Sequence, residues 1–325
     1  MTVLVTGGAG YIGSHMTYAL GDAGERVVVL DNLSTGVRAN VAPDAVFVQG
    51  DVSDAALVKH LIAEHGIDAV IHFAGSIVVP ESVEQPLAYY ANNTAASRSL
   101  IEACVDAGVK AFIFSSTATV YAVDAKQPLA ETEPTVPISP YARSKLMTEW
   151  MLEDASRAYD FRHMILRYFN VAGADPKGRT GQSSPRATHL IKRAAQVALG
   201  RVPHLDIFGT DYPTADGTAI RDYIHVSDLV AIHRLALEHL REGGSPEIFN
   251  CGYGHGSSVL DVVGAVERVV GRKLPTVLQP RRAGDPPALV ANVDKLRERF
   301  AWQPREFSLD GIVRSALDWE KRLPG

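Results

Sequence analysis

The chain has 325 residues, of which 46% are hydrophobic and 21% are charged, and its net charge is −5. This composition is typical of a globular protein and excludes a wholly disordered chain. The negative charge argues against nucleic-acid binding as the main activity, and no apolar run reaches the roughly 18 residues that cross a membrane. Two cysteines, Cys104 and Cys251, are too few for a disulfide framework. We therefore expect a cytoplasmic protein of two domains.

Short apolar runs alternate with helical segments over the first part of the chain. The predicted strands are 2–6, 26–30, 45–49, 68–73, 110–116 and 162–169, and the predicted helices are 11–23, 53–65, 85–107 and 140–158. Continuous Val, Ile and Phe runs are typical of strands buried on both faces. The alternation predicts an α/β fold with a Rossmann-type doubly wound parallel sheet, whose ligands bind at the carboxyl ends of the strands.

The pattern changes after about Asn170, where the strands shorten and the loops at 174–188 and 209–222 lengthen. We expect a second, smaller mixed α/β lobe built largely from loops. The predicted domains are 1–170, to which 226–251 returns, and 171–325.

A glycine-rich turn joins the first strand to the first helix. Gly7, Gly10 and Gly13 fall where backbone N–H groups and the helix dipole can hold a pyrophosphate. A side chain at Gly10 would obstruct the phosphate, and one at Gly13 would push the helix off the strand. The turn predicts a dinucleotide site.

Acidic and small residues follow the next strands. Asp31 ends the second strand, where a carboxylate binds an adenosine ribose and repels a 2′-phosphate, so NAD is favoured over NADP. Asp51 follows the third strand and Phe73-Ala74-Gly75 follows the fourth, where the adenine and the second ribose would lie. NAD is the predicted cofactor.

A tyrosine and a lysine share one face of the helix that Ser139 and Pro140 begin. Tyr141 and Lys145 are four residues apart, and Thr117 ends the fifth strand. A tyrosine is a poor base at its ordinary pKa of about 10. We expect the Lys145 ammonium and the nicotinamide charge to lower the pKa of Tyr141. The group then predicts hydride transfer between a carbinol and NAD, with Tyr141 as proton acceptor and donor.

Together these residues resemble the extended short-chain dehydrogenase/reductase superfamily, and within it the UDP-glucose 4-epimerase family along nearly the whole chain. The segments that carry the resemblance are GGAGYIGSH (7–15), DNLSTG (31–36), HFAG (72–75), PLAYYANN (86–93), SSTATVYA (115–122), SPYARSKLMTE (139–149), LRYFNVAGA (166–174), IFGTDYPTADGTAIRDYIHVSDL (207–229) and RRAGDPPA (281–288).

The resemblance implies roles for individual residues. Tyr141 is the implied catalytic base, Lys145 its electrostatic partner and Thr117 the hydroxyl between base and substrate. Further implied cofactor contacts are Tyr11, Ile12, Asp31, Asn32, Asp51, Val52, Phe73, Ala74, Gly75, Asn92 and Phe169. Implied UDP-sugar contacts are Asn170, Leu190, Phe208, Arg221, Tyr223, Arg282 and Asp285, with the two arginines on the pyrophosphate. No metal is implied, and a homodimer is implied through the helices at 85–107 and 140–158.

The implied activity is interconversion of UDP-galactose and UDP-glucose by transient oxidation at C4 and re-reduction on the opposite face. UDP-xylose/arabinose and UDP-N-acetylglucosamine are alternative substrates that share this chemistry. Leu289 stands where relatives gate the 2-acetamido group, so acceptance of N-acetylated sugars stays open. Ile77 replaces a cofactor-contacting lysine found in many relatives.

Two other kinds of protein are disfavoured. Nucleotide-sugar dehydratases and decarboxylating relatives carry acidic residues after the strand-end threonine, where this chain has Ala118 and Thr119. A non-catalytic NAD-binding protein is the remaining alternative, although such proteins have typically lost the Tyr/Lys pair.

Overall fold

The computed structural model describes residues 1–184, 187–282, 285–305 and 308–324. The chain forms two compact units. Unit 1 comprises Met1–Ala122, Pro134–Arg167 and Val230–Phe249, and unit 2 comprises Val123–Glu133, Tyr168–Leu229 and the chain from Asn250 onward. The sequence patterns do not separate the short segment Val123–Glu133 from its surroundings.

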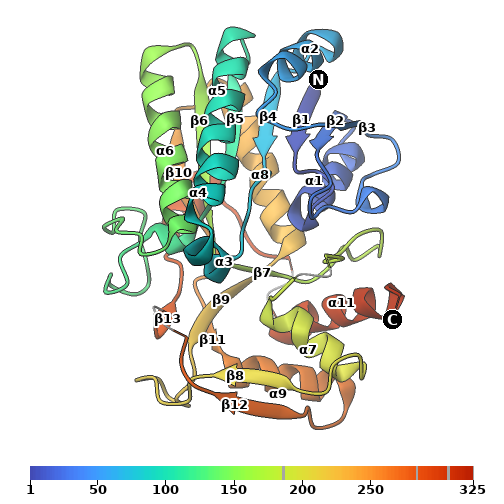
Figure 1. Cartoon of the computed structure of the whole chain (residues 1–325), viewed down its shortest axis with the longest axis vertical. Helices are drawn as coiled ribbons and strands as arrows, with labels where there is room; N and C mark the ends of the chain where they lie inside the picture. Colours follow the sequence, from blue (N-terminus) through green and yellow to red (C-terminus); the bar gives the residue numbers. More distant parts are fainter. Residues whose placement is uncertain (185–186, 283–284, 306–307, 325) are drawn as a thin grey trace. The chain divides into compact units, whose positions relative to one another are not determined.

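A seven-stranded sheet forms the centre of unit 1, in the order β10-β6-β5-β4-β1-β2-β3 (Figure 1). Its strands are β1 (Thr2–Thr6), β2 (Arg26–Asp31), β3 (Val46–Gln49), β4 (Ala69–His72), β5 (Ala111–Thr117), β6 (Arg162–Tyr168) and β10 (Glu247–Cys251). The pairs from β5 through β4, β1 and β2 to β3 are all parallel. This is the Rossmann-type arrangement that the alternation predicts, so the fold class is confirmed.

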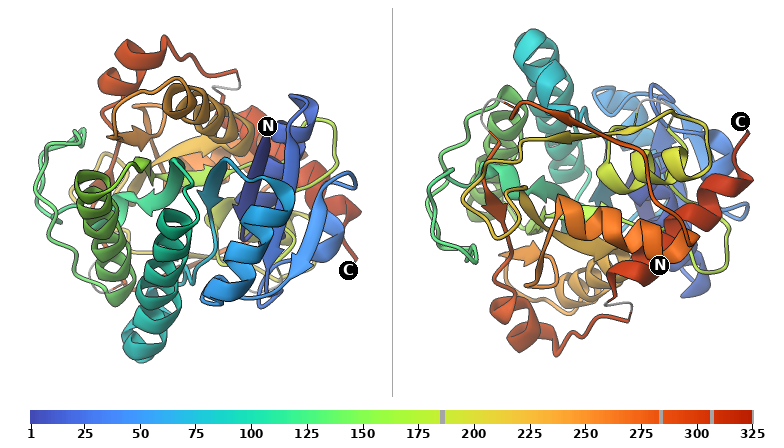
Figure 2. Two further views of the ribbon diagram at one scale, coloured as in Figure 1. Left: turned by 90° about the horizontal axis from the view of Figure 1, so that it is seen from above. Right: turned by 90° about the horizontal axis from the view of Figure 1, so that it is seen from below.

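Helices cover both faces of this sheet. They are α1 (Tyr11–Asp22), α2 (Ala55–His65), α3 (Val79–Glu84), α4 (Pro86–Tyr89), α5 (Ala96–Asp106), α6 (Pro140–Ala158) and α8 (Val226–Arg241), with short helical turns η1 (Arg38–Asn40), η2 (Tyr90–Ala95) and η3 (Ala118–Val120). Seen from above, α2, α5 and α6 lie side by side on one face (Figure 2). The predicted helix at 85–107 is confirmed as an uninterrupted helix from Pro86 to Asp106, in which the π-helical segment η2 joins α4 to α5.

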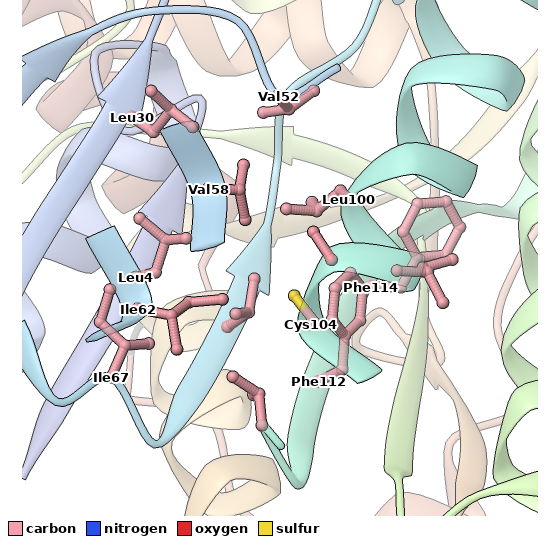
Figure 3. Packing of buried hydrophobic residues seen from close by; sticks show 14 of the residues in the cluster. Leu4, Leu30, Val52, Val58, Ile62, Ile67, Leu100, Cys104, Phe112 and Phe114 are labelled. Atoms are coloured by element: carbon pink, nitrogen blue, oxygen red, sulfur yellow. The ribbon is translucent and has the colours of Figure 1, made fainter. Parts of the chain in front are cut away.

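The apolar core under α2 and α5 explains why the central strands read as continuous hydrophobic runs. Leu4 of β1 and Phe112 of β5 are fully buried, and they pack with Leu100 and Cys104 of α5 (Figure 3). The expectation that every strand is buried on both faces fails at β3, where Val46 is 44% exposed. This strand lies at the sheet edge and pairs with β2 alone.

Unit 2 contains two small sheets and several helices. The four-stranded sheet consists of β7 (Asn170–Ala172), β9 (Ile220–His225), β11 (Gly256–Ser258) and β13 (Ala288–Leu289), and β8 (Leu205–Phe208) pairs with β12 (Thr276–Gln279). The helices are α7 (Leu190–Ala198), α9 (Val259–Val270), α10 (Asp294–Phe300) and α11 (Leu309–Arg322).

The predicted mixed α/β character of this lobe is confirmed, and a long loop joins β8 to β9 as the sequence indicates. The helix α9 even carries local signals in the sequence, because Ser258 and Asp261 form a reciprocal capping box and Gly271 closes the helix in the left-handed conformation. None of the helices in the described ranges is long and apolar enough to cross a membrane.

Candidate active site

The glycine turn of unit 1 brings backbone very close to backbone. Gly7 has φ +69°, and a Cβ there would lie 2.6 Å from the Ala74 nitrogen. A Cβ on Gly13 would collide with the Gly7 carbonyl and lie 2.9 Å from Gly8 Cα. Gly10 is the N-cap of α1, where no side chain caps the helix and no acidic residue occupies the first turn. Tyr11 and Ile12 open this helix, so its amide groups are presented to an anion.

Asp31, the last residue of β2, holds this turn. Its buried carboxylate accepts hydrogen bonds from Ala9 N (2.9 Å) and Leu33 N (2.8 Å). Asn32 Nδ2 donates to Asp51 Oδ2 (2.9 Å) after the neighbouring strand, which brings two predicted adenine-side residues together. A carboxylate has room for further donors, so Asp31 can also accept a ribose hydroxyl.

Asp51 lies in the loop after β3 and accepts hydrogen bonds from Ser53 in the same loop. Hydrogen bonds from Ser53 hold the pKa of Asp51 below its ordinary value, although burial opposes this shift. Val52 packs into the apolar core under α2 and α5. Phe73, after β4, has its ring 5.0 Å from that of His233. The close-packed glycines, the uncapped helix and Asp31 together fit NAD.

The predicted catalytic residues meet at the carboxyl end of β5. Thr117 ends β5, and its hydroxyl is near enough to the Tyr141 phenol to lower the pKa of that phenol. Ser139 caps α6 through Ala142 N (3.2 Å), and Pro140 is its first residue, both as predicted. Lys145 is 3% exposed, and its Nζ donates to Ser115 O (3.0 Å).

The sequence predicts a lowered pKa for Tyr141, whereas the protein's own groups raise it. Burial raises the pKa of Tyr141 to about 12, and the nearby Thr117 hydroxyl offsets only part of this. The Lys145 ammonium instead contacts Ser115 O and lies 4.9 Å from the centroid of the Phe114 ring. Burial also lowers the pKa of Lys145 to about 8. Desolvation thus favours the neutral form of both groups.

Asn93 is a site residue that the sequence reasoning missed. Its side chain accepts from Ser76 N (2.8 Å) and donates to Ser76 O (3.0 Å) and to Ser144 Oγ (3.0 Å). A Cβ on Gly75 would lie 3.1 Å from Asn93 Oδ1 and 3.5 Å from Lys145 Nζ. Asn93 therefore fastens the loop after β4 to α6 beside Lys145. Asn92, the predicted residue, is exposed and bonds Ser76 Oγ (2.9 Å).

Most of the predicted substrate residues gather around the small sheets of unit 2. Asn170 on β7 is in register with Tyr223 on β9, and Arg221 on β9 is in register with Leu289 on β13. Arg221 also forms an ion pair with Asp285.

Two further predicted residues lie against each other in unit 2. The Arg282 guanidinium stacks 3.9 Å from the centroid of the Phe208 ring, which ends β8. Two guanidinium groups, those of Arg221 and Arg282, suit a diphosphate.

Phe169, a predicted cofactor contact, belongs to unit 2. Its amide donates to Cys251 O (3.2 Å).

Asp222, which the sequence reasoning also missed, holds this sheet together. It lies between Arg221 and Tyr223, and its buried carboxylate accepts from Tyr253 N (2.8 Å), Gly254 N (2.8 Å) and Ala291 N (3.2 Å). Burial nevertheless raises its pKa, and these hydrogen bonds work against that shift.

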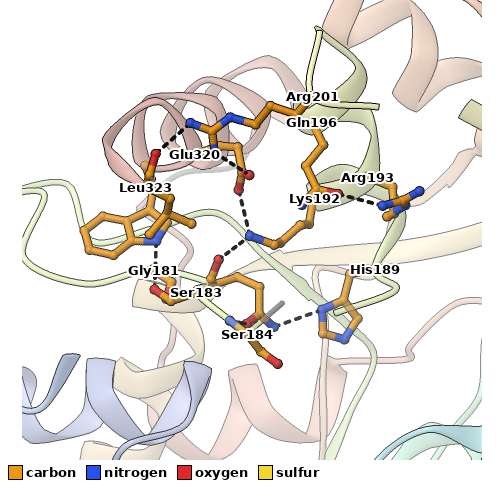
Figure 4. A network of polar contacts seen from close by, with 12 residues as sticks. Gly181, Ser183, Ser184, His189, Lys192, Arg193, Gln196, Arg201, Glu320 and Leu323 are labelled. Carbon is orange, nitrogen blue, oxygen red and sulfur yellow. Dashed lines mark hydrogen bonds and ion pairs between the residues drawn. The ribbon is translucent and has the colours of Figure 1, made fainter. Parts of the chain in front are cut away.

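A polar network lies beside α7, the helix that Leu190 begins (Figure 4). Lys192 Nζ donates to Glu320 Oε2 of α11 (2.7 Å) and to Gln182 O (2.8 Å). Arg201 donates to the other Glu320 oxygen (3.0 Å). The network fixes the loop before α7 and the first turn of that helix to α11.

The sequence model of the NAD dependent epimerase/dehydratase family matches residues 3–252. The chain belongs to this family. It is 58% identical to UDP-glucose 4-epimerase of Azospirillum brasilense over 321 residues, which cover 99% of this chain and 92% of that protein.

Two crystal structures extend the comparison to the fold. UDP-glucose 4-epimerase from Brucella ovis in complex with NAD is 45% identical, with TM-score 0.94 and coverage of 98% of this chain and 97% of that one. The enzyme from Bifidobacterium longum in complex with NAD+ and UDP is 37% identical, with TM-score 0.93 and coverage of 99% and 98%. As a member of the NAD dependent epimerase/dehydratase family, the protein is an NAD-dependent enzyme, and the predicted cofactor is confirmed.

The glycine turn gives a test of the cofactor site. We expect Gly13→Ala to reduce bound NAD by about tenfold or more, since its methyl group would push α1 off the turn and about 1.4 kcal/mol of affinity is a factor of ten. The measurement is the nucleotide content of the purified protein. The matched control is Gly21→Ala in the same helix, where a Cβ meets nothing within 4 Å. Equal NAD content in the two variants would contradict the assignment.

Proposed function

We propose that this protein interconverts UDP-galactose and UDP-glucose by inverting the configuration at C4 of the sugar. The observation that carries the proposal is the 58% identity with UDP-glucose 4-epimerase along 99% of the chain. Tyr141, with the Thr117 hydroxyl near its phenol and the buried Lys145 one helical turn away, supplies the proton-transfer group that this reaction needs. NAD, when bound, supplies the acceptor and donor of hydride and a positive charge at its oxidised ring.

Tyr141 removes the proton of the sugar 4-hydroxyl and later returns it. The Thr117 hydroxyl bonds Thr119 Oγ1 (3.0 Å) and lies near the Tyr141 phenol, so it is placed to relay or orient that proton. Lys145 stabilises the phenolate by its charge, and burial of both groups excludes water that would screen this interaction. One residue acts as base and as acid, so a reversible reaction needs no second titrating group.

The second part of the proposal concerns the nucleotide. Arg221 and Arg282 bind the diphosphate, and Phe208, Leu190, Asn170 and Tyr223 contact the rest of the UDP-sugar. Asp285, now paired with Arg221, orients that guanidinium. Anchoring the UDP far from C4 lets the 4-keto sugar rotate within the site without dissociating, so that hydride returns to its opposite face.

A substrate panel decides which sugar is used. UDP-galactose is incubated with the purified protein and no added cofactor, beside UDP-xylose and UDP-N-acetylglucosamine. We expect UDP-glucose to form from UDP-galactose. If the protein carries NAD but forms no product from UDP-galactose, the proposal is contradicted. Faster turnover of another UDP-sugar of the panel would identify that sugar as the preferred substrate.

The role of the phenol gives a second prediction. Tyr141→Phe should lower kcat about 10²- to 10⁴-fold, because the variant cannot transfer the proton. Bound NAD, measured on the same preparation, should be retained, since the change removes one hydroxyl. Activity near that of the unchanged protein would refute the role of Tyr141.

The diphosphate contact gives a third prediction. Arg221→Met should raise KM for UDP-galactose about tenfold to a hundredfold, since a hydrogen bond to a charged group contributes about 1.5–3 kcal/mol. The control is Arg268→Met in α9, which removes an exposed ion pair with Asp310. We expect the control to behave like the unchanged protein in steady-state kinetics. The same KM in both variants would show that Arg221 does not hold the substrate.

The homodimer is a separate proposal of ours. In unit 1, Leu87 of α4 and Trp150 of α6 are 80% and 53% exposed. An apolar hollow beside them is lined by Tyr90, Met147 and Met151, among others. A second copy that covers these helices would remove this apolar surface from water.

The cytoplasmic location expected from the sequence stays a prediction.

Sedimentation tests the homodimer. We expect the protein to sediment as a dimer and Trp150→Glu to sediment as a monomer, since a charge would be buried in the interface. Tyr159→Glu is the control, because Tyr159 is 59% exposed just past the end of α6. Dimers of equal stability in both variants would place the contact elsewhere.

A further inference from the structure

A buried ion pair, which the proposed reaction does not use, lies one helical turn beyond Lys145. Glu149 follows Lys145 by four residues on α6, so the two side chains share a face of the helix. Arg167 of β6 donates to Glu149 through Nε (3.1 Å) and through a terminal nitrogen (2.6 Å). The side chains of Arg167 and Glu149 are only 4% and 1% exposed.

The same carboxylate reaches the strand that carries Thr117. Ser116 donates its hydroxyl to Glu149, and Ser116 directly precedes Thr117 in β5. The Arg167 guanidinium lies 4.8 Å from the centroid of the Tyr121 ring, just after the 3₁₀ turn η3. Glu149 thus links α6, β5 and β6 at the point where the proposed catalytic residues meet.

Stability alone is a weak reason for such a pair. Removing two charges from water is costly, and neutral residues of similar volume often replace a buried ion pair without loss of stability. The arrangement therefore points to a use for the negative charge at this place.

The surroundings of Lys145 offer that use. Burial lowers the pKa of Lys145 to about 8, and the charge of Glu149 works against this loss of the ammonium form. On β4, His72 stays neutral, because burial and then Lys145 lower its pKa to about 3. From β5, Lys145 meets the neutral carbonyl of Ser115 and the Phe114 ring.

Another pair of ionisable groups lies on the helices α3 and α4. Tyr89 of α4 donates to Glu81 of α3 (2.8 Å), and the charge of Tyr141 is among the smaller influences on the Tyr89 pKa. The neighbour of Lys145 in η2 is the amide Asn93, which is uncharged.

We propose that Glu149 is a positioning residue of the active site: held by Arg167, its carboxylate keeps the Lys145 side chain in the ammonium form and fixes Ser116 beside Thr117. Glu149 does not touch substrate or cofactor and acts through Lys145 and β5. The catalytic consequence rests on the proposed function, whereas the protonation of Lys145 does not.

The test is Glu149→Gln, which keeps an acceptor for Ser116 and removes the charge. The protonation of Lys145 is followed by NMR of protein labelled with carbon-13 at the lysine Cε positions, with Lys145→Met used to assign the signal. We expect the Lys145 midpoint to move to lower pH by about one unit, since loss of a nearby opposite charge disfavours the charged form. The alkaline limb of kcat/KM should move in the same direction.

Two matched variants isolate the charge. Glu153→Gln removes a carboxylate one turn further along α6, where the side chain is 35% exposed, and should leave the Lys145 midpoint unchanged. Glu149→Asp keeps the charge and should restore most of the midpoint. A purely structural Glu149 would lower thermal stability in Glu149→Gln without moving the midpoint, and that result would overturn the proposal.

Glu149→Gln leaves Arg167 buried without its partner and is expected to destabilise the fold. If that variant does not fold, Arg167→Gln replaces it in the titration, because it keeps the Glu149 carboxylate and removes the opposing cation. The Lys145 midpoint should then move to higher pH, and an unchanged midpoint overturns the proposal. If the unchanged protein shows no epimerase activity, the proposed function fails while the titration still decides the role of Glu149.

Discussion

The phenol of Tyr141 and the ammonium of Lys145 are removed from water on one face of α6, and unit 1 is arranged around this burial. Desolvation pushes both groups toward their neutral forms, raising the pKa of Tyr141 to about 12 and lowering that of Lys145 to about 8. To bring such a phenol near neutral pH takes about 7 kcal/mol of differential stabilisation. Burial outweighs the opposing effect of Thr117, so we infer that this stabilisation comes from the charge of the bound cofactor together with a Lys145 that stays protonated.

Most of the fold of unit 1 was predictable, because the signals are local. Buried parallel strands need apolar side chains on both faces, and the runs that form β1, β2, β4, β5 and β6 provide them. The edge strand β3 has similar residues but only one neighbour, and a sequence run does not show how many neighbours a strand has. The π-helical segment η2 within the helix at 86–106 escaped detection because Tyr90–Ala95 contains no proline or glycine that would mark it.

The residues of the candidate site likewise fall into those that local sequence signals predict and those that they do not. The glycine turn, Asp31 and the Tyr141–Lys145 pair lie within one strand–turn–helix unit or one helix turn, so their spacing alone carried the prediction. Asn93 and Glu149 gain their importance from partners in other elements, Ser76 and Arg167, which only the folded chain brings near. The burial of the Tyr141 phenol was not foreseen for a related reason, since spacing predicts which charges are close but not how much water is lost.

Asp31 has a consequence for attempts to change the cofactor preference. The carboxylate that would discriminate against a 2′-phosphate also accepts the amides of Ala9 and Leu33, and so supports the backbone on either side of the phosphate turn. Selectivity and loop architecture are therefore coupled in one side chain. Redesign toward NADP would have to rebuild both anchoring points rather than exchange a single charge, because a neutral or basic replacement would leave those amides without their acceptor.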